Sequence, residues 1–317
     1  MKNFADRLTE AVRKKKSCLV AGLDPRLDLI PVVIRARAFR KFGRTLEGAA
    51  AAALEFSRVF IDIVAPHVPA IKPQIAFFEQ FGWAGFRAYC ESVAHAKKRG
   101  LLVIGDVKRG DIGTTMAAYA DAHLGCVKVD GKACAPIGAD AITVAAYVGS
   151  DVLLPFADYL AKQGKGIFVL VRTSNPSARD LQDITSRGER VYEAMARHVT
   201  RWGAPYVGRS GYSAVCAVVG GTDPKAAARL RKLMPRTIFL VPGFGAQGAT
   251  PQDVKVCFKR DGTGAVVASA RAINFAYTLP PWKDLYGERK WERAVEEAAI
   301  AANKELNRIT HTHKELK

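Results

Sequence analysis

The 317-residue chain is 49% hydrophobic and 25% charged, which is the composition of a globular protein with one large core or two smaller ones. No apolar run is long enough to cross a bilayer, and the first residues lack the apolar core of a signal peptide, so we expect a cytoplasmic protein without a membrane partner. The net charge of +18 is high for a metabolic enzyme and raises the question of a nucleic-acid partner.

The basic residues are distributed along the chain rather than concentrated in one segment. They gather around residues 13–16, 35–44, 97–99 and 255–260, and several of these clusters coincide with expected helix C-terminal turns, where cations complement the helix dipole. No zinc-finger motif or RNA-binding aromatic motif accompanies them. We therefore expect a solvated basic surface and no nucleic-acid partner, although a positive field can attract an anionic substrate.

The six cysteines are scattered, at Cys18, Cys90, Cys126, Cys134, Cys216 and Cys257. They form neither a CxxC pair nor the Cys/His spacing of a metal site, so we expect no bound metal and reduced, mostly buried thiols. Cys126 and Cys134 are near enough in sequence to approach each other, but ordinary structural cysteines are the simpler interpretation.

Short β-branched apolar runs alternate with helical patterns over nearly the whole chain, which is typical of repeated βα units around a parallel sheet. The eight predicted strands cover residues 18–23, 70–72, 101–106, 141–145, 166–171, 214–219, 237–241 and 265–268. Eight units favour a closed (β/α)8 TIM barrel over an open, doubly wound sheet. We predict a single barrel domain over residues 1–317, with short insertions around 35–44 and 127–137 and a C-terminal outer helix over 288–306.

Ordinary start and stop signals mark the predicted helices. Asp223 followed by Pro224 is typical of an N-cap with proline at the first helical position. The basic residues 97–99 precede Gly100, which is typical of a helix end just before the third strand.

Polar residues follow the predicted strands where the catalytic face of a barrel is expected. The densest cluster ends the third strand, Asp106-Val107-Lys108-Arg109-Gly110-Asp111-Ile112. Because side chains alternate faces in a strand, Asp106 and Lys108 should project to the same side, with Asp111 in the loop that follows. A surface salt-bridge network is the alternative interpretation, but the position at the barrel mouth favours a functional site.

The last two predicted strands are followed by a candidate phosphate site. Gly243, Gly245 and Gly248 allow backbone N–H groups to approach an anion, and Arg271 supplies a forked cationic donor. Barrel enzymes often bind phosphate in these two loops. By composition alone, a plain turn and a surface arginine explain the residues equally well.

The ordered set of motifs resembles the orotidine 5'-phosphate decarboxylase family, in its longer bacterial subfamily. The resemblance rests on Asp106-x-Lys108-x-x-Asp111-Ile112-Gly113-x-Thr115, with Lys72 on the preceding strand and Arg271 after the last one. It extends to Ile71-Lys72-Pro73-Gln74-Ile75-Ala76-Phe77-Phe78-Glu79, Arg172-Thr173-Ser174-Asn175-Pro176 and Val241-Pro242-Gly243-Phe244-Gly245-Ala246-Gln247-Gly248. By order of elements it covers essentially the whole chain.

The resemblance implies cofactor-free conversion of orotidine 5'-monophosphate (OMP) to UMP and carbon dioxide, the last step of de novo pyrimidine synthesis. Loss of the carboxylate leaves a carbanion on a ring carbon without a good electron sink, so the site must stabilise it electrostatically. Lys108 would hold a positive charge beside that carbon and then deliver the proton. Asp106 and Asp111 would hold Lys72 and Lys108 in an array of alternating charge.

The resemblance also implies a set of substrate contacts. Asp24 and Lys72 would contact the ribose hydroxyls. Ser174 would donate a hydrogen bond to the pyrimidine, or could instead only cap the turn that follows it. Gln247 and Arg271 would bind the phosphate, whose binding energy could drive closure of a loop over the site.

The remaining residues of the motif, Asp111, Ile112 and Thr115, would by the same resemblance belong to the active site of the neighbouring subunit. The enzyme would then be a homodimer with shared active sites. Nothing in the spacing of these residues shows this arrangement.

Two alternatives stay open at this point. Magnesium-dependent 3-hexulose-6-phosphate synthases and ketogulonate-phosphate decarboxylases resemble the third strand of this barrel group, but lack the preceding strand-end lysine, so Lys72 argues against them. A non-catalytic, basic nucleic-acid-binding protein has only the +18 charge in its favour.

Overall fold

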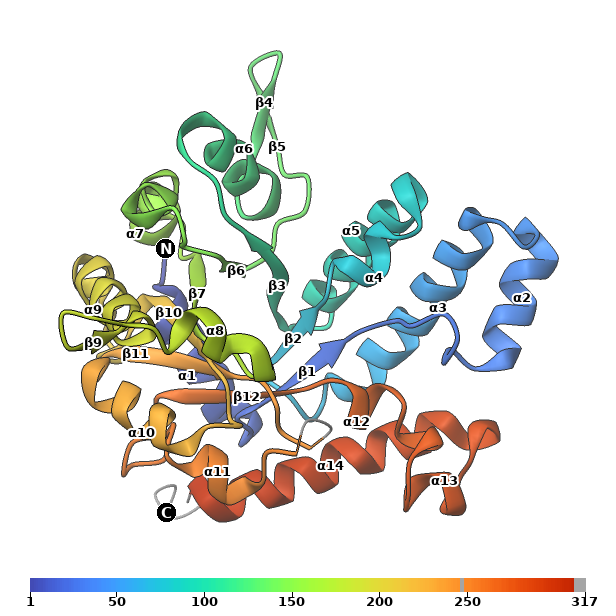
Figure 1. Ribbon diagram of the computed structural model, residues 1–317. Helices are drawn as coiled ribbons and strands as arrows, with labels where there is room; N and C mark the ends of the chain where they lie inside the picture. Colours follow the sequence, from blue (N-terminus) through green and yellow to red (C-terminus); the bar gives the residue numbers. More distant parts are fainter. Residues whose placement is uncertain (246–247, 311–317) are drawn as a thin grey trace.

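The computed structural model describes residues 1–245 and 248–310, and its centre is a closed barrel of eight parallel strands. Around the barrel the strands follow the order β1, β12, β11, β10, β7, β6, β3, β2 (Figure 1). Their bounds are β1 (Leu19–Leu23), β2 (Ala70–Pro73), β3 (Leu102–Arg109), β6 (Ala141–Val144), β7 (Gly166–Arg172), β10 (Ser213–Val219), β11 (Thr237–Val241) and β12 (Ala265–Ser269). The predicted (β/α)8 architecture is confirmed.

All eight predicted strands correspond to strands of the barrel. Most of them are buried on both faces, because one face lines the barrel interior and the other packs against helices. Continuous apolar runs, rather than alternating ones, are the sequence pattern that such strands produce. The main difference lies in β3, which continues past Asp106 to Arg109.

Helices of different lengths connect the strands and cover the barrel (Figure 1). They are α1 (Phe4–Lys15), α2 (Val32–Phe42), α3 (Leu46–Val64), α4 (Ala76–Glu79), α5 (Gly82–Lys98), α6 (Gly113–His123), α7 (Ala157–Lys162), α8 (Arg179–Gln182), α9 (Val191–Gly203), α10 (Pro224–Leu233), α11 (Pro251–Lys255), α12 (Arg271–Asn274), α13 (Trp282–Leu285) and α14 (Trp291–Thr310). Two small antiparallel pairs lie outside the barrel, β4 (Val127–Val129) with β5 (Lys132–Cys134) and β8 (Thr185–Ser186) with β9 (Glu189–Arg190).

The helix boundaries follow the chemistry of their caps. The Asp223 side chain accepts a hydrogen bond from the Ala226 backbone N–H, as expected for the start of α10. Helix α5 has Lys97 and Lys98 in its last turn, where they complement the helix dipole. The predicted final helix begins with a 3-10 turn over Glu288–Lys290 and continues as α14, which packs outside the barrel against α3.

Helix α1 closes the N-terminal end of the barrel. Phe4 packs edge-to-face on Phe168 at a centroid distance of 5.9 Å. Asp6 accepts hydrogen bonds from backbone N–H groups just before β10, and Arg7 pairs with Asp140 just before β6 at 2.5 Å. The opposite end, where the strands finish, stays open for a site.

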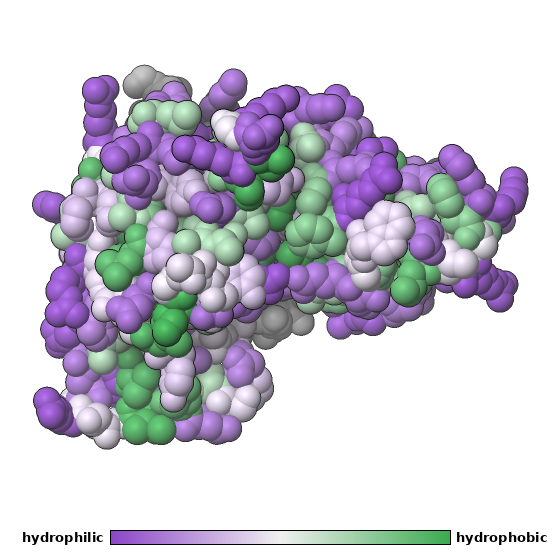
Figure 2. Space-filling model, turned by 90° about the horizontal axis from the view of Figure 1, so that it is seen from above, coloured by the Kyte–Doolittle hydropathy of each residue, from purple (hydrophilic) through white to green (hydrophobic). Residues whose placement is uncertain are grey.

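The two predicted insertions form separate structures. Residues 35–44 lie in and after α2, which pairs with the N-terminal part of α3 as a helical hairpin projecting to the right in Figures 1 and 2. This hairpin exposes the apolar side chains of Val32, Val33, Phe42 and Leu46. The second insertion contains the β4–β5 hairpin, which extends away from the barrel beyond α6 (Figure 1).

The cysteines are all free in the described structure, but only half of them are buried. Cys18, Cys216 and Cys257 are buried, whereas Cys126 and Cys134 are exposed at the base of the β4–β5 hairpin. The prediction of mostly buried thiols is wrong for these two, because a projecting two-stranded hairpin has no core in which to bury them.

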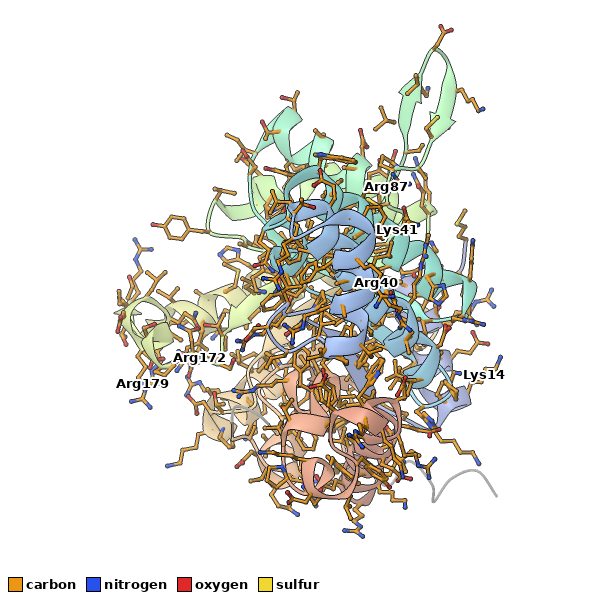
Figure 3. The ribbon with its side chains drawn as sticks, turned by 90° about the vertical axis from the view of Figure 1, so that its right-hand side faces the viewer. Lys14, Arg40, Lys41, Arg87, Arg172 and Arg179 are labelled. Atoms are coloured by element: carbon orange, nitrogen blue, oxygen red, sulfur yellow. The ribbon has the colours of Figure 1, made fainter. Side chains whose placement is uncertain are left out.

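Many of the basic side chains lie at the surface, on several different elements. Figure 3 shows Arg40 and Lys41 on α2, Arg87 on α5 and Lys14 on α1, with Arg179 at the far edge. In this view Lys14 and Arg179 lie on opposite sides of the molecule, away from Arg40, Lys41 and Arg87. No helix in the described part of the chain is both long and apolar enough to cross a membrane.

Candidate functional site

A cavity of about 660 Å³ opens at the C-terminal ends of the barrel strands. Every strand of the barrel, or the loop directly after it, contributes to its lining. The lining residues are Asp24, Lys72, Gln74, Asp106, Lys108, Thr143, Leu170, Thr173, Ser174, Asn175, Val218, Leu240, Pro242, Gly243, Phe244, Ala268, Ala270 and Arg271. In (β/α)8 enzymes this is the face that carries the active site.

The Asp106 carboxylate is the centre of the polar side of the cavity. Its Oδ2 accepts hydrogen bonds from Lys72 Nζ at 2.6 Å and Gln74 Nε2 at 3.0 Å. Its Oδ1 accepts from Lys108 Nζ at 2.6 Å and Thr143 Oγ1 at 3.0 Å. Each oxygen therefore binds one ammonium and one neutral donor, which fixes the rotation of the carboxylate.

The two lysines differ in accessibility. The Lys72 side chain is 10% exposed, whereas the Lys108 side chain is 48% exposed at the cavity wall. Lys72 thus lies deeper in the cavity wall, and Lys108 is the ammonium group that is more accessible to a bound molecule.

Burial and charge act in opposite directions on this cluster. Burial alone would lower the pKa of Lys72, but the negative charges of Asp106 and Asp24 outweigh it and the pKa is raised. Burial would raise the pKa of Asp106, but the two ammonium groups outweigh it and hold that pKa well below the ordinary value. Lys72 and Asp106 are therefore a charged pair at neutral pH.

Asp24 lies at the end of β1 beside this pair. Burial is the largest influence on it and raises the pKa of its carboxyl group, with Lys72 acting in the opposite direction. Its backbone is held by Asn274, whose Oδ1 accepts from the Asp24 N–H at 3.1 Å and whose Nδ2 donates to the Gly22 carbonyl at 2.5 Å. Asn274 is completely buried and thereby joins the end of β1 to α12.

The backbone of β3 is irregular where it presents Asp106 and Lys108. In the parallel register with β6, Gly105 pairs with Ile142 and Arg109 with Val144, so three residues of β3 face one of β6. Lys108 has a φ of +44°, a left-handed conformation that is uncommon for a residue other than glycine. Both side chains do face the cavity as predicted, but through a bulge rather than a regular strand.

Ser174 lies in the loop after β7, where it lines the cavity. Gln182 holds this loop by donating to Thr173 Oγ1 at 2.7 Å and accepting from the Thr173 N–H at 3.0 Å. On the other side, a Cβ at Gly220 would lie 3.0 Å from the Ser174 backbone, so only glycine allows this approach without displacement.

The loop after β11 has the conformation that its glycines predict. Gly243, Gly245 and Gly248 have φ values of +105°, +77° and +89°, in the left-handed region that glycine adopts without strain. Arg271 begins α12 across the cavity mouth, is exposed, and makes no ion pair within residues 1–245 and 248–310. Gln247, the other predicted phosphate contact, lies outside the described residues.

Three predicted site residues lie away from this cavity. Asp111 Oδ1 accepts a hydrogen bond from the N–H of Ile112 at 2.8 Å, and neither residue lines the cavity. Ile112 is 53% exposed, and Thr115 is also exposed on α6. Within one chain, therefore, the charge array consists of Lys72, Asp106 and Lys108 without Asp111.

Sequence reasoning missed Gln74, Thr143 and Asn274. Gln74 stands two residues after Lys72, and this spacing along an extended segment is a signal for the same face. Thr143 is a single polar residue within a predicted buried strand, which is also a usable signal, because a buried hydroxyl needs a partner. Asn274 has no such signal, since its partners lie at the other end of the chain.

The geometry suits stabilisation of an anion. Fixed ammonium groups in a partly enclosed cavity stabilise negative charge that develops beside them without having to reorganise. The accessible Lys108 can also donate a proton at that position. An arginine and a glycine loop at the other side of the cavity are suited to a phosphate.

Comparison with known proteins identifies the family. The family model described as Orotidine 5'-phosphate decarboxylase / HUMPS family matches residues 50–277. The orotidine 5'-phosphate decarboxylase of Rhodopirellula baltica is 43% identical over 306 residues, which cover 96% of this chain and 99% of the relative. The chain belongs to this family.

Further relatives in the family are similar over their whole length. The orotidine 5'-phosphate decarboxylase of Clostridium novyi is 39% identical over 304 residues, covering 96% of this chain and 98% of the relative. The solved structure of Leishmania donovani OMP decarboxylase matches with a TM-score of 0.72 at 32% identity, covering 98% of this chain and 99% of that one. The eight-stranded barrel described above is thus the fold of this family.

Proposed function

We propose that the protein is a carboxy-lyase that converts OMP to UMP and carbon dioxide without a cofactor, in the last step of UMP biosynthesis. The observation that carries this proposal is the Asp106 carboxylate held between Lys72 and Lys108 at 2.6 Å each, on the wall of the barrel cavity. Membership of the family and the names of the curated relatives support the same activity.

The charge array meets the main demand of the reaction. When the carboxylate leaves, the electron pair of the broken bond remains on the ring carbon, and Lys108 places a positive charge beside it. The same ammonium then donates its proton to that carbon, which completes UMP. Asp106 keeps Lys108 in place, and its own charge lies near the substrate carboxylate.

Other residues are assigned to parts of the substrate. Arg271 and the glycine loop after β11, together with Gln247, bind the phosphate. Asp24 and Lys72 bind the ribose hydroxyls, and Ser174 donates a hydrogen bond to the pyrimidine. This assignment spreads the substrate across the cavity, with its reacting carbon at Lys108.

We also infer a homodimer in which Asp111, Ile112 and Thr115 complete the site of the partner subunit. The exposure of Ile112 and Thr115, and the absence of all three from the lining of their own chain's cavity, support this arrangement. Asp111 would then add the second carboxylate of the array from the partner.

The other expectations form part of the same proposal. Residues 1–317 act as one barrel domain, the protein works in the cytoplasm, and its basic surface serves no nucleic-acid partner. The spread of the basic side chains over several elements supports the last point (Figure 3).

The function is tested by mixing the purified protein with OMP in the absence of added metal and following the absorbance of the orotate ring. We expect the absorbance to fall at the same rate with and without EDTA. Activity on OMP that disappears in EDTA would favour the magnesium-dependent alternative, and no activity under either condition would overturn the proposal.

A further inference from the structure

We propose that Thr143 is a positioning residue, whose hydroxyl group sets the relative positions of Asp106 and Lys108. This inference rests on the proposed decarboxylase function and deepens it. Thr143 lies on β6, is 2% exposed, and belongs to none of the motifs that identify the site in the sequence.

The Thr143 hydroxyl group accepts hydrogen bonds from the backbone of the β3 bulge. Between the pairs Gly105–Ile142 and Arg109–Val144, the strands β3 and β6 lose their regular register. The N–H groups of Val107 and Lys108 instead donate to Thr143 Oγ1, at 3.0 Å and 2.9 Å. Since buried N–H groups require an acceptor, this one hydroxyl replaces the pairing that the bulge removes.

The proton of the Thr143 hydroxyl group is donated to Asp106. A threonine hydroxyl has two acceptor positions and one proton. The two backbone N–H groups occupy both acceptor positions, so the proton is left for Asp106 Oδ1, which lies 3.0 Å away. All hydrogen-bonding capacity of the group is used, and its orientation is therefore determined.

The hydrogen bonds of Thr143 act on both Lys108 and Asp106. Lys108 adopts a left-handed backbone conformation, which costs roughly 1–2 kcal/mol for a residue with a side chain. Its bonded N–H helps to hold that conformation, and the Lys108 ammonium meets the same Asp106 oxygen as the hydroxyl. The Thr143 hydroxyl group thereby holds the backbone N–H of Lys108, the proton donor. The same hydroxyl group holds the side-chain carboxylate of Asp106.

The test compares two substitutions of Thr143 with one control. Thr143→Val keeps the shape but removes the hydroxyl, whereas Thr143→Ser keeps the hydroxyl. Thr237→Val is the matched control, because Thr237 is a buried barrel threonine at the start of β11, away from the cavity. For each folded variant, kcat for OMP decarboxylation and Kd for UMP are measured, and a crystal structure is determined.

We expect kcat of Thr143→Val to fall on the order of 10²-fold, because small displacements of reacting groups are that costly. Its Kd for UMP should change by less than about 3-fold, since UMP lacks the carboxylate that reacts. Thr143→Ser and Thr237→Val should stay within about 3-fold of the wild-type kcat. A purely structural role for the hydroxyl would instead impair UMP binding and turnover together.

A folded Thr143→Val variant with the wild-type kcat would overturn the inference, as would a parallel loss of UMP binding. If the valine variant does not fold, kcat of the serine variant tests the inference instead. Thr143→Ser keeps the hydroxyl group, so a large loss of its kcat would contradict a role for that group. The crystal structure of Thr143→Val separates this inference from the proposed function. Unchanged positions of Asp106 and Lys108 would refute the positioning role even if the wild type does not act on OMP, whereas wild-type inactivity alone refutes only the decarboxylase.

Discussion

Arg172 at the end of β7 pairs with Asp183 in the segment that follows Ser174, with 3.0 Å between Nη1 and Oδ1. The Arg172 side chain is 5% exposed, and it also contacts Asp223 at the start of α10 at 3.3 Å. The buried guanidinium therefore ties the loop that lines one side of the cavity to the body of the barrel. Its carboxylate partners lie on two different loops.

Asp183→Ala should weaken substrate binding through this link. With one of its two carboxylate partners gone, Arg172 holds the Ser174 loop less firmly, and we expect KM for OMP to rise by about 5- to 30-fold, corresponding to roughly 1–2 kcal/mol. Asp180→Ala, an exposed change on the same segment, is the control. Steady-state kinetics of both variants check this, and equal KM values would contradict it.

Lys108→Ala should remove nearly all turnover while the protein remains folded. The substitution deletes both the positive charge beside the carbanion and the proton that the product needs. Single-turnover assays and circular dichroism measure the two properties. Lys162→Ala, at a solvent-exposed lysine on α7, should behave as the wild type. Substantial decarboxylation by the Lys108 variant would exclude it as the proton donor.

Arg271→Ala should reduce kcat/KM on the order of 10²-fold, because a charge-assisted hydrogen bond to a phosphate contributes roughly 2–3 kcal/mol. Arg40→Ala on α2 removes the same charge far from the cavity and serves as the control. The kinetics of both variants with OMP provide the measurement. An unchanged kcat/KM for Arg271→Ala would mean that the phosphate binds elsewhere.

Mixing Lys108→Ala and Asp111→Ala chains should restore part of the activity that each has lost. In a mixed dimer, one of the two sites would contain an intact Lys108 and an intact Asp111 from different subunits. Activity is measured after the two variants have been incubated together, and subunit exchange is verified by native mass spectrometry. Complete exchange without any recovered activity would count against shared sites.

Asp106→Asn should destabilise the protein by about 3 kcal/mol at neutral pH, because it leaves the buried Lys72 ammonium without its main partner. The pKa of Asp106 is lowered in the folded state, so its contribution to stability is present above the unfolded value of 3.8 and is lost as the pH falls toward the folded value. Urea unfolding of wild type and variant should therefore differ by a constant amount from about pH 7 to 5 and converge at lower pH. A difference that widens on acidification would contradict the sign of this pKa shift.

Much of the fold could be predicted because barrel strands have a simple sequence pattern. Runs such as 237–241 and 265–268 are apolar and β-branched, and the observed strands β11 and β12 match them to within one residue. Sequence reasoning missed the β4–β5 hairpin although a local signal for it exists, since the alternating run Val127-Lys128-Val129 is followed by Asp130-Gly131, and both turn residues have a positive φ.

The site residues could be predicted where charged side chains follow apolar strands. They could not be predicted where the backbone conformation or the partner depends on contacts between distant parts of the chain. Lys72, Asp106 and Lys108 were found because their charges stand out against apolar runs. The left-handed conformation of Lys108 was hidden, because nothing in an alternating pattern indicates a bulge. The contact between Asn274 and Asp24 depends on chain closure, and no local sequence pattern encodes it.

The pairing of the first barrel strand with the last one has a consequence for synthesis on the ribosome. Strand β1 pairs with β2 on one edge and with β12, nearly a whole chain length later, on the other. A nascent chain therefore carries a β1 edge with unpaired backbone groups until almost all of the protein has been translated. Such an edge readily pairs with other chains, so the last strand to emerge is also the one that protects the first from aggregation.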